Sequence, residues 1–88
     1  MNFAQEVDKV LTELAEMLVE KNLKYGDAAL NPKRIFSRAN TIEQIKVRMD
    51  DKLSRIANAQ DNEDEDPEWD LMGYLVILRI ARNRGNDR

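Results

Sequence analysis

Cysteine and histidine are both absent from the 88 residues of the chain. The chain therefore cannot form disulfides, thiolate nucleophiles, Ser-His-Asp triads or the Cys/His sites that hold zinc. Any bound metal must be a hard cation held by carboxylates. A lack of cysteine is also typical of cytosolic proteins.

Glycine and proline are scarce, with three and two residues respectively. This composition favours helices over a turn-rich sandwich or barrel. Hydrophobic residues make up 42% of the chain, enough for a small core, and the length suits one domain. The sequence therefore predicts a single all-α domain over residues 1–88.

Long hydrophobic runs are missing as well. The longest strongly apolar stretch, residues 71–78, contains Gly73 and is far shorter than the ~20 residues that span a bilayer. The opening residues MNFAQEVDKV lack the basic and apolar blocks of a signal peptide. We therefore expect a cytoplasmic protein with no membrane partner.

Apolar residues recur at helical spacing in three segments, about 3–25, 41–59 and 67–83. Each segment follows a capping signature: Asn2 with Gln5, Asn40 with Glu43 or Thr41 with Gln44, and Asp66 with Pro67. Gly26 offers a left-handed exit from the first helix. The apolar stripe on one face of the first segment contains Phe3, Val7, Val10, Leu11, Leu14 and Leu18.

The third segment has almost no polar face between Leu71 and Ala81. A helix of this kind must be covered on nearly all sides, and two amphipathic neighbours from one small chain cannot surround it. The sequence therefore predicts a homo-oligomeric helical bundle, a dimer or a multiple of dimers.

Charges are segregated along the chain. Seven acids and no bases lie between Asp61 and Asp70, which leaves 14 bases against ten acids elsewhere. Nine of these bases lie between Lys21 and Arg55, where they either face phosphate or are ordinary surface residues balanced by acids across the fold. The dense acidic stretch would repel a nucleic-acid backbone, so we expect no extended DNA binding.

Three aspartates are candidate catalytic and metal-binding residues. Asp50 and Asp51 are adjacent in the middle of a predicted helix, where aspartate has poor propensity, and Asp70 borders the apolar segment. A part-buried Asp70 needs a cation, an arginine or a metal to compensate it. Together the three carboxylates could bind Mg²⁺, although Asp51 could instead pair with Arg48 or Arg55.

Basic residues near these aspartates are candidate phosphate ligands. Lys21, Arg48 and Arg55 are expected to hold phosphates, and Lys52 either joins them or forms a surface salt bridge along its own helix.

The long segment from Gly26 to Ala39 is expected to fold over a ligand. Its candidate contacts are Tyr25, Asp27, Asn31, Lys33 and Arg34. The alternative is that Ile35 and Phe36 only plug the end of the bundle.

Three strings carry a resemblance to a known family: KNLKYGDAALNPKRIF, RMDDKLSRIAN and DLMGYLVILRIA. They resemble the phage nucleotide modification associated family, and the layout is more remotely similar to MazG-type all-α nucleoside triphosphate pyrophosphatases. In MazG-type enzymes carboxylates on two helices hold Mg²⁺ against a nucleotide. Ser54 and Pro67 stand where that pattern has acids, so the resemblance implies nucleotide binding more directly than hydrolysis.

Two functions from different classes follow. In the first, Mg²⁺ on Asp50, Asp51 and Asp70 polarises the phosphates, and a metal-activated water splits a nucleoside triphosphate into monophosphate and pyrophosphate. In the second, the same pocket sequesters a nucleotide or cyclic nucleotide without metal, as a phage protein acting against host defence in the host cytoplasm. A helical partner-binding module is a third, simpler hypothesis.

Overall fold

The computed structural model describes residues 1–58 and 64–85, and every regular element in them is helical. Helix α1 comprises Phe3–Lys24, α2 comprises Thr41–Ala57 and α3 comprises Pro67–Asn83. The all-α prediction is confirmed, and the predicted bounds agree to within a residue except at the end of the second helix, which the structure places at Ala57 with Asn58 as C-cap. The predicted end of the second helix, residue 59, lies outside the described residues.

The capping residues explain where the helices begin. The Asn2 side chain accepts a hydrogen bond from the Gln5 amide, completing the expected capping box. Asn40 accepts from the Glu43 amide at 2.8 Å, so it is the N-cap of α2. Asp66 caps α3, with Pro67 at the first helical position. After α1 the chain turns through two left-handed residues, Gly26 and Asp27, with φ of 62° and 61°.

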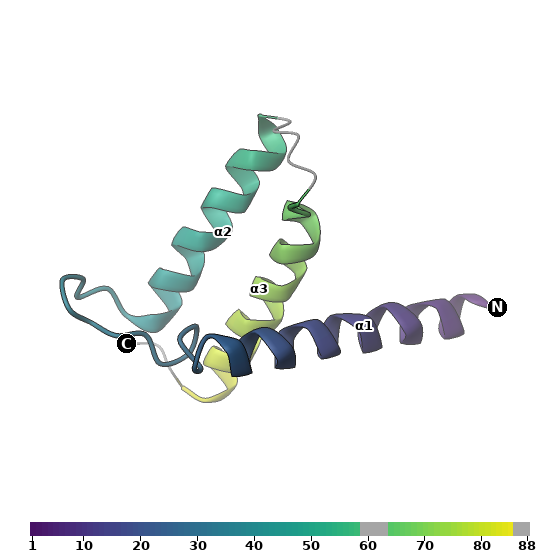
Figure 1. The fold of residues 1–88 in the computed structure, drawn as a ribbon, viewed down its shortest axis with the longest axis horizontal. Helices are drawn as coiled ribbons and strands as arrows, with labels where there is room; N and C mark the ends of the chain where they lie inside the picture. Colours follow the sequence, from purple (N-terminus) through teal and green to yellow (C-terminus); the bar gives the residue numbers. More distant parts are fainter. Residues whose placement is uncertain (59–63, 86–88) are drawn as a thin grey trace.

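Helices α2 and α3 form an antiparallel hairpin, and α1 crosses α3 (Figure 1). The hairpin core contains Ile42, Ile45 and Ala81, with partly buried side chains from both helices around them. Leu30, from the segment between α1 and α2, completes this core. That segment is therefore anchored by Leu30. Ile35 and Phe36 are exposed, and Phe36 keeps 97% of its surface, so the alternative that they plug the bundle end is wrong.

Gly73 marks the contact between α1 and α3. An ideal Cβ at this position would lie 3.0 Å from Cδ2 of Leu18 and 3.4 Å from Cε of Met17. The missing side chain therefore lets α1 approach α3 closely. Leu14, one turn before Leu18, is also buried.

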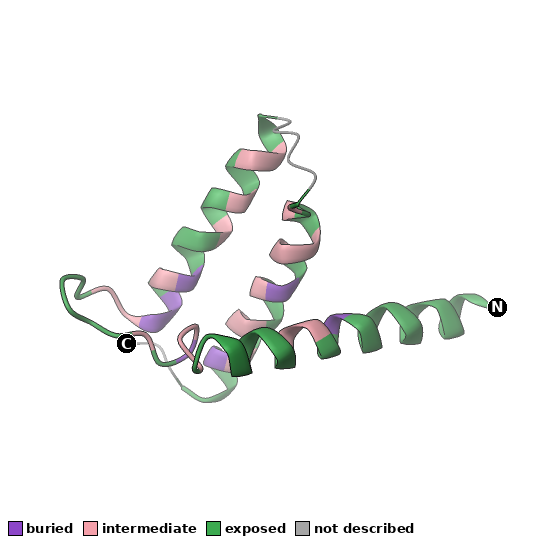
Figure 2. Ribbon diagram, in the orientation of Figure 1, coloured by how far each residue is buried: buried purple, intermediate pink, exposed green. Residues whose placement is uncertain are grey.

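The N-terminal half of α1 projects beyond α3 on the side away from α2 (Figures 1 and 2). We call residues 3–11 the arm. Phe3, Val7, Val10 and Leu11 are exposed there, and Phe3 keeps 80% of its surface. The first four residues of the stripe therefore lie outside the core of the chain, because the stripe extends past the helix it packs on.

Helix α3 is also incompletely covered. Only Gly73 and Ala81 are buried, whereas Met72, Leu75 and Val76 are exposed. The chain alone therefore does not provide the all-round cover that the sequence of α3 calls for. Among the described residues, no helix combines the length and apolar character needed to cross a bilayer.

Candidate functional site

A cavity of about 720 Å³ opens between the end of α1, the middle of α2 and the first half of α3. Its volume lies within the range of small-molecule sites. All three helices and the turn after α1 contribute to its walls. The polar and aromatic lining residues are Lys21, Asn22, Tyr25, Arg48, Lys52, Asp64, Glu65, Asp66, Trp69, Asp70 and Tyr74.

Asp70 is the meeting point of the three helices. Its Oδ1 lies 3.3 Å from Nζ of Lys21 on α1, and its Oδ2 lies 3.4 Å from Nζ of Lys52 on α2. The Lys52 and Asp70 side chains are only 14% and 18% exposed. The expectation that Asp70 is part-buried and compensated is therefore confirmed, with two lysines as the compensating groups. Lys52 pairs across the fold and not along its own helix.

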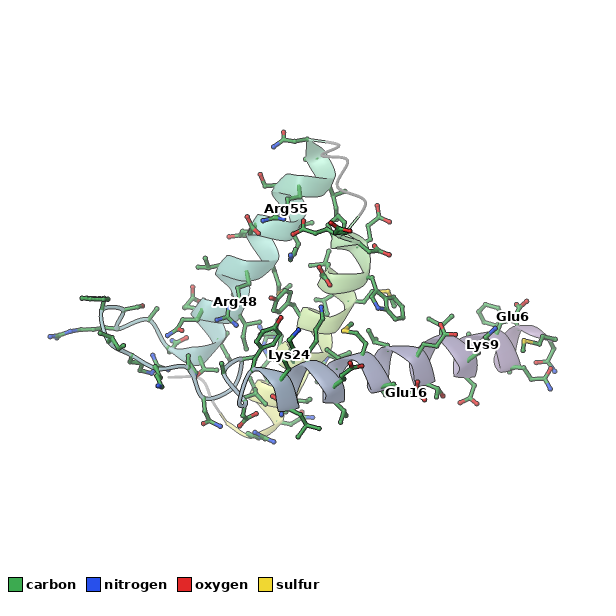
Figure 3. All side chains as sticks on the ribbon, viewed as in Figure 1. Glu6, Lys9, Glu16, Lys24, Arg48 and Arg55 are labelled. Carbon is green, nitrogen blue, oxygen red and sulfur yellow. The ribbon has the colours of Figure 1, made fainter. Side chains whose placement is uncertain are left out.

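Arg48 adds a third cation to the same cavity. It lies one turn before Lys52 on α2, so both side chains share one face. Figure 3 shows it two turns before Arg55 on that helix. Arg48 forms no ion pair with a described residue. Its guanidinium is therefore available for an anionic ligand.

Aromatic rings line the cavity beside these cations. Tyr25 follows α1, and Trp69 and Tyr74 come from α3. Flat rings of this kind stack on nucleobases of any sequence. Gly73, Ala28 and Ala29 also line the cavity.

The end of the cavity near the start of α3 is acidic. Glu65 accepts a hydrogen bond from Arg55, which also pairs with Asp51 at 3.2 Å. The hydrogen bond with Glu65, and then the charge of Asp51, raise the pKa of Arg55 above its ordinary value. Arg55 therefore ties the segment before α3 to α2, and it does not line the cavity.

The three candidate catalytic and metal-binding aspartates are not brought together. Asp50 and Asp51 are exposed on α2, Asp51 pairs with Arg55, and both oxygens of Asp70 face lysines. No group of three acids in residues 1–58 and 64–85 is arranged to hold a metal ion. These three aspartates do not fit a shared Mg²⁺ site as they lie, so magnesium stays a prediction.

Of the five predicted contacts of the loop, Tyr25 lines this cavity, whereas the other four lie outside it: Asp27, Asn31, Lys33 and Arg34. Asp27 accepts a hydrogen bond from the Asn31 side chain, which closes the turn after α1. Arg34 donates to the Ala39 carbonyl and, at 3.0 Å, to the Thr41 hydroxyl, so it holds the segment against the start of α2. Lys33 is exposed.

Sequence reasoning brought Lys21, Tyr25, Arg48, Lys52 and Asp70 into one site but missed Trp69, Tyr74 and Asn22. A signal for Tyr74 was present, because it follows Asp70 by four residues and so shares its helix face. Asn22 and Trp69 could be placed only once the crossing of α1 over α3 was known.

Comparison with known proteins gives no family assignment. No family model, curated protein or solved structure matches the chain. The resemblance to the phage nucleotide modification associated family and to MazG-type enzymes therefore stays a hypothesis that rests on the quoted residues.

Proposed function

We propose that the chain binds a nucleotide in the cavity between its three helices. The observation that carries this proposal is the union, in one cavity of about 720 Å³, of three cationic side chains with three aromatic rings. Cations bind phosphate oxygens through charge-assisted hydrogen bonds, and rings stack on a base. The phosphates of a nucleotide can thus bind the cationic side chains, and its base can stack on the aromatic rings.

The charge distribution gives the ligand a direction. The phosphates lie toward Lys21, Arg48 and Lys52, because the acidic end of the cavity near Asp66 repels them. The same carboxylates accept hydrogen bonds from base amino groups or sugar hydroxyls. Phosphate oxygens compete with Asp70 for the two lysine ammonium groups, so phosphate binding is readily reversible.

Of the two functions considered, binding without hydrolysis has the better support. A metal-dependent pyrophosphohydrolase needs carboxylates that are free to bind the cation. Both oxygens of Asp70 lie within 3.4 Å of lysine nitrogens, and Asp51 is paired with Arg55. We therefore favour a phage-type protein that sequesters a nucleotide or cyclic nucleotide in the cytoplasm of its host, as a homo-oligomer. Magnesium-dependent hydrolysis is the alternative.

A nucleotide panel tests this proposal by thermal unfolding, in EDTA and in Mg²⁺. A true ligand at a hundredfold excess over its Kd stabilises the protein by about 2.7 kcal/mol, and we expect this stabilisation in EDTA. Absence of stabilisation by every nucleotide would reject the site. Stabilisation only with Mg²⁺, accompanied by pyrophosphate release, would support the hydrolase instead.

Arg48→Gln is the sharpest variant, because Arg48 lines the cavity and forms no ion pair with a described residue. We expect its nucleotide affinity to fall about tenfold, the loss of one charge-assisted contact, with an unchanged melting temperature. Lys46→Gln is the matched control on the same helix, since Lys46 lies outside the cavity and, among the described residues, pairs only with Glu43, at 3.8 Å. Calorimetric titration compares the two variants.

A further inference from the structure

Helix α3 presents an exposed seam on the side opposite its core residues. The seam consists of Glu68, Met72, Leu75 and Arg79. Their spacing of four, three and four residues places all of them on one helix face, with the spacing of a coiled-coil contact. The seam therefore has two apolar residues in its centre and one charge of each sign at its ends.

This seam is complementary to itself when it is reversed. The midpoint between Glu68 and Arg79 is also the midpoint between Met72 and Leu75, and it falls between residues 73 and 74. If two copies of α3 pair antiparallel about this point, Met72 of each meets Leu75 of the other. Each Glu68 then meets the other copy's Arg79. A two-fold interface requires self-complementarity of this kind.

The end charges are available for such pairing. Neither Glu68 nor Arg79 forms an ion pair with a described residue, and both are exposed. In a parallel pair, like charges would face each other across the seam and oppose association. The charge pattern therefore favours the antiparallel arrangement over the parallel one.

The chain also exposes more surface than a compact monomer of its mass. The accessible surface is 6932 Å², whereas a compact monomer of this mass exposes about 5,300 Å². The difference of roughly 1,600 Å² exceeds the ~800 Å² that each partner buries in a standard interface. Exposed apolar side chains of the arm and of α3 account for part of this surplus.

We propose that two copies of this chain form a two-fold dimer through antiparallel α3 seams, with each arm lying over the partner's α3. Helix α1 continues past its own α3 on the side away from α2, which is the side the second α3 occupies (Figure 1). The apolar stripe of the arm continues along α1 to Leu14, which is buried, and to Leu18, which contacts Gly73 of α3. In the dimer, the arm therefore packs on the partner's α3 in the way that the second half of α1 packs on the α3 of its own chain.

This inference goes beyond nucleotide binding and does not depend on it. The seam lies on the side of α3 away from the residues that line the cavity, such as Asp70 and Ile77. A failure of the dimer would therefore leave the nucleotide site intact, and a failure of nucleotide binding would leave the dimer intact.

Mass measurement with a seam variant tests the proposal. We expect the wild-type chain to sediment at twice its 10.2 kDa at micromolar concentration. Leu75→Glu buries a charge in the seam and should raise the dissociation constant by at least about tenfold. Val47→Glu, an equivalent change at an exposed apolar residue of α2, is the matched control and should leave the dimer unchanged. Circular dichroism of each variant verifies that the helices are retained.

Charge reversal tests the orientation. Glu68→Arg and Arg79→Glu should each weaken self-association severalfold, because like charges then meet at both ends of the seam. The double variant should recover wild-type affinity. An equimolar mixture of the two single variants should form a heterodimer in preference to either homodimer, which can be detected by native mass spectrometry.

Any one of three results would overturn the proposal. The first is a wild-type chain that is still monomeric at about 100 µM. The others are a dimer that Leu75→Glu leaves intact, and single charge variants that do not prefer each other as partners. A larger assembly supports the α3 seam if both charge variants loosen it and the double variant restores it. A larger assembly that ignores these changes counts against the seam.

Discussion

Asp70 holds two lysines at once, which leaves one unit of positive charge in excess among these three side chains. The carboxylate of Asp70 stabilises the largely buried ammonium group of Lys52 in the folded state. Its negative charge also weakens the attraction of the cavity for phosphate. Asp70 therefore acts in opposite directions on stability and on ligand affinity.

Asp70→Asn separates these two effects. We expect unfolding free energy to fall by about 1–2 kcal/mol, because Lys52 and Lys21 then face each other without a counter-charge. In the same variant, metal-free affinity for a nucleoside triphosphate should rise about three- to tenfold, since phosphate no longer competes with a carboxylate. Urea unfolding and calorimetric titration measure the two quantities.

Asp50→Asn is the control for this experiment, because Asp50 is exposed and has no ion pair with a described residue. Its stability should stay within about 0.5 kcal/mol of wild type. A gain of stability in Asp70→Asn, together with a loss of nucleotide binding, would contradict this account and indicate a carboxylate that serves a metal ion.

At the scale of the elements, the position of α1 depends on one glycine. Gly73→Leu places a side chain where the Cδ2 atom of Leu18 already lies 3.0 Å from an ideal Cβ. Overpacking of this kind costs about 1–3 kcal/mol, and leucine is a good helix former, so the loss reports packing and not helix propensity. We expect a lower unfolding free energy and weaker nucleotide binding, because α1 forms one wall of the cavity.

Gly73→Ala is the milder companion variant. The added methyl group gains about 1 kcal/mol of helix propensity, and the flexible ends of Leu18 and Met17 must yield only slightly. Its stability should therefore lie within about 1 kcal/mol of wild type. Equal losses in both variants, measured by urea unfolding, would show that the contact at residue 73 does not set the position of α1.

The helices themselves could be predicted from the sequence, since caps such as Asn2 and Asp66 act locally and fix each start within one residue. The arrangement of α1 could not. Periodicity marks which residues share a face, such as Val7 with Leu14, but it does not say where along the stripe the neighbouring helix ends. The arm and the contribution of Trp69 to the cavity both follow from that one crossing.

Among the site residues, charge compensation of Asp70 was predictable because a part-buried carboxylate needs a counter-charge. The identity of its partners was not, since Lys21 and Lys52 lie 49 and 18 residues away in the sequence. The loop residues Lys33 and Arg34 looked suitable by charge alone. Leu30 anchors that segment in the core, and the two basic residues that follow it lie outside the cavity.

At the scale of the whole molecule, the chain is less compact than a globular domain of the same length. Its radius of gyration is 14.4 Å, whereas a compact domain of this size has about 12 Å. If two copies share the seam, folding and association are linked, and the melting temperature must rise with protein concentration. We expect a rise of several degrees for a hundredfold increase in wild-type protein, about 2.7 kcal/mol of coupling.

Scanning calorimetry at two concentrations measures this rise. The Leu75→Glu variant should melt at a lower temperature than the wild type at each concentration, because its seam associates more weakly. A wild-type melting temperature that is independent of concentration would mean that the chain folds and unfolds as a monomer.

The cavity also has a spectroscopic consequence. The chain contains one tryptophan and two tyrosines, and Trp69, Tyr25 and Tyr74 all line this cavity. Tryptophan and tyrosine are the side chains that absorb appreciably at about 280 nm. All of those in this chain therefore border the same cavity. The intrinsic fluorescence and near-ultraviolet circular dichroism of the native protein consequently report on this one region, and an occupant that stacks on these rings carries its own signal without any added label.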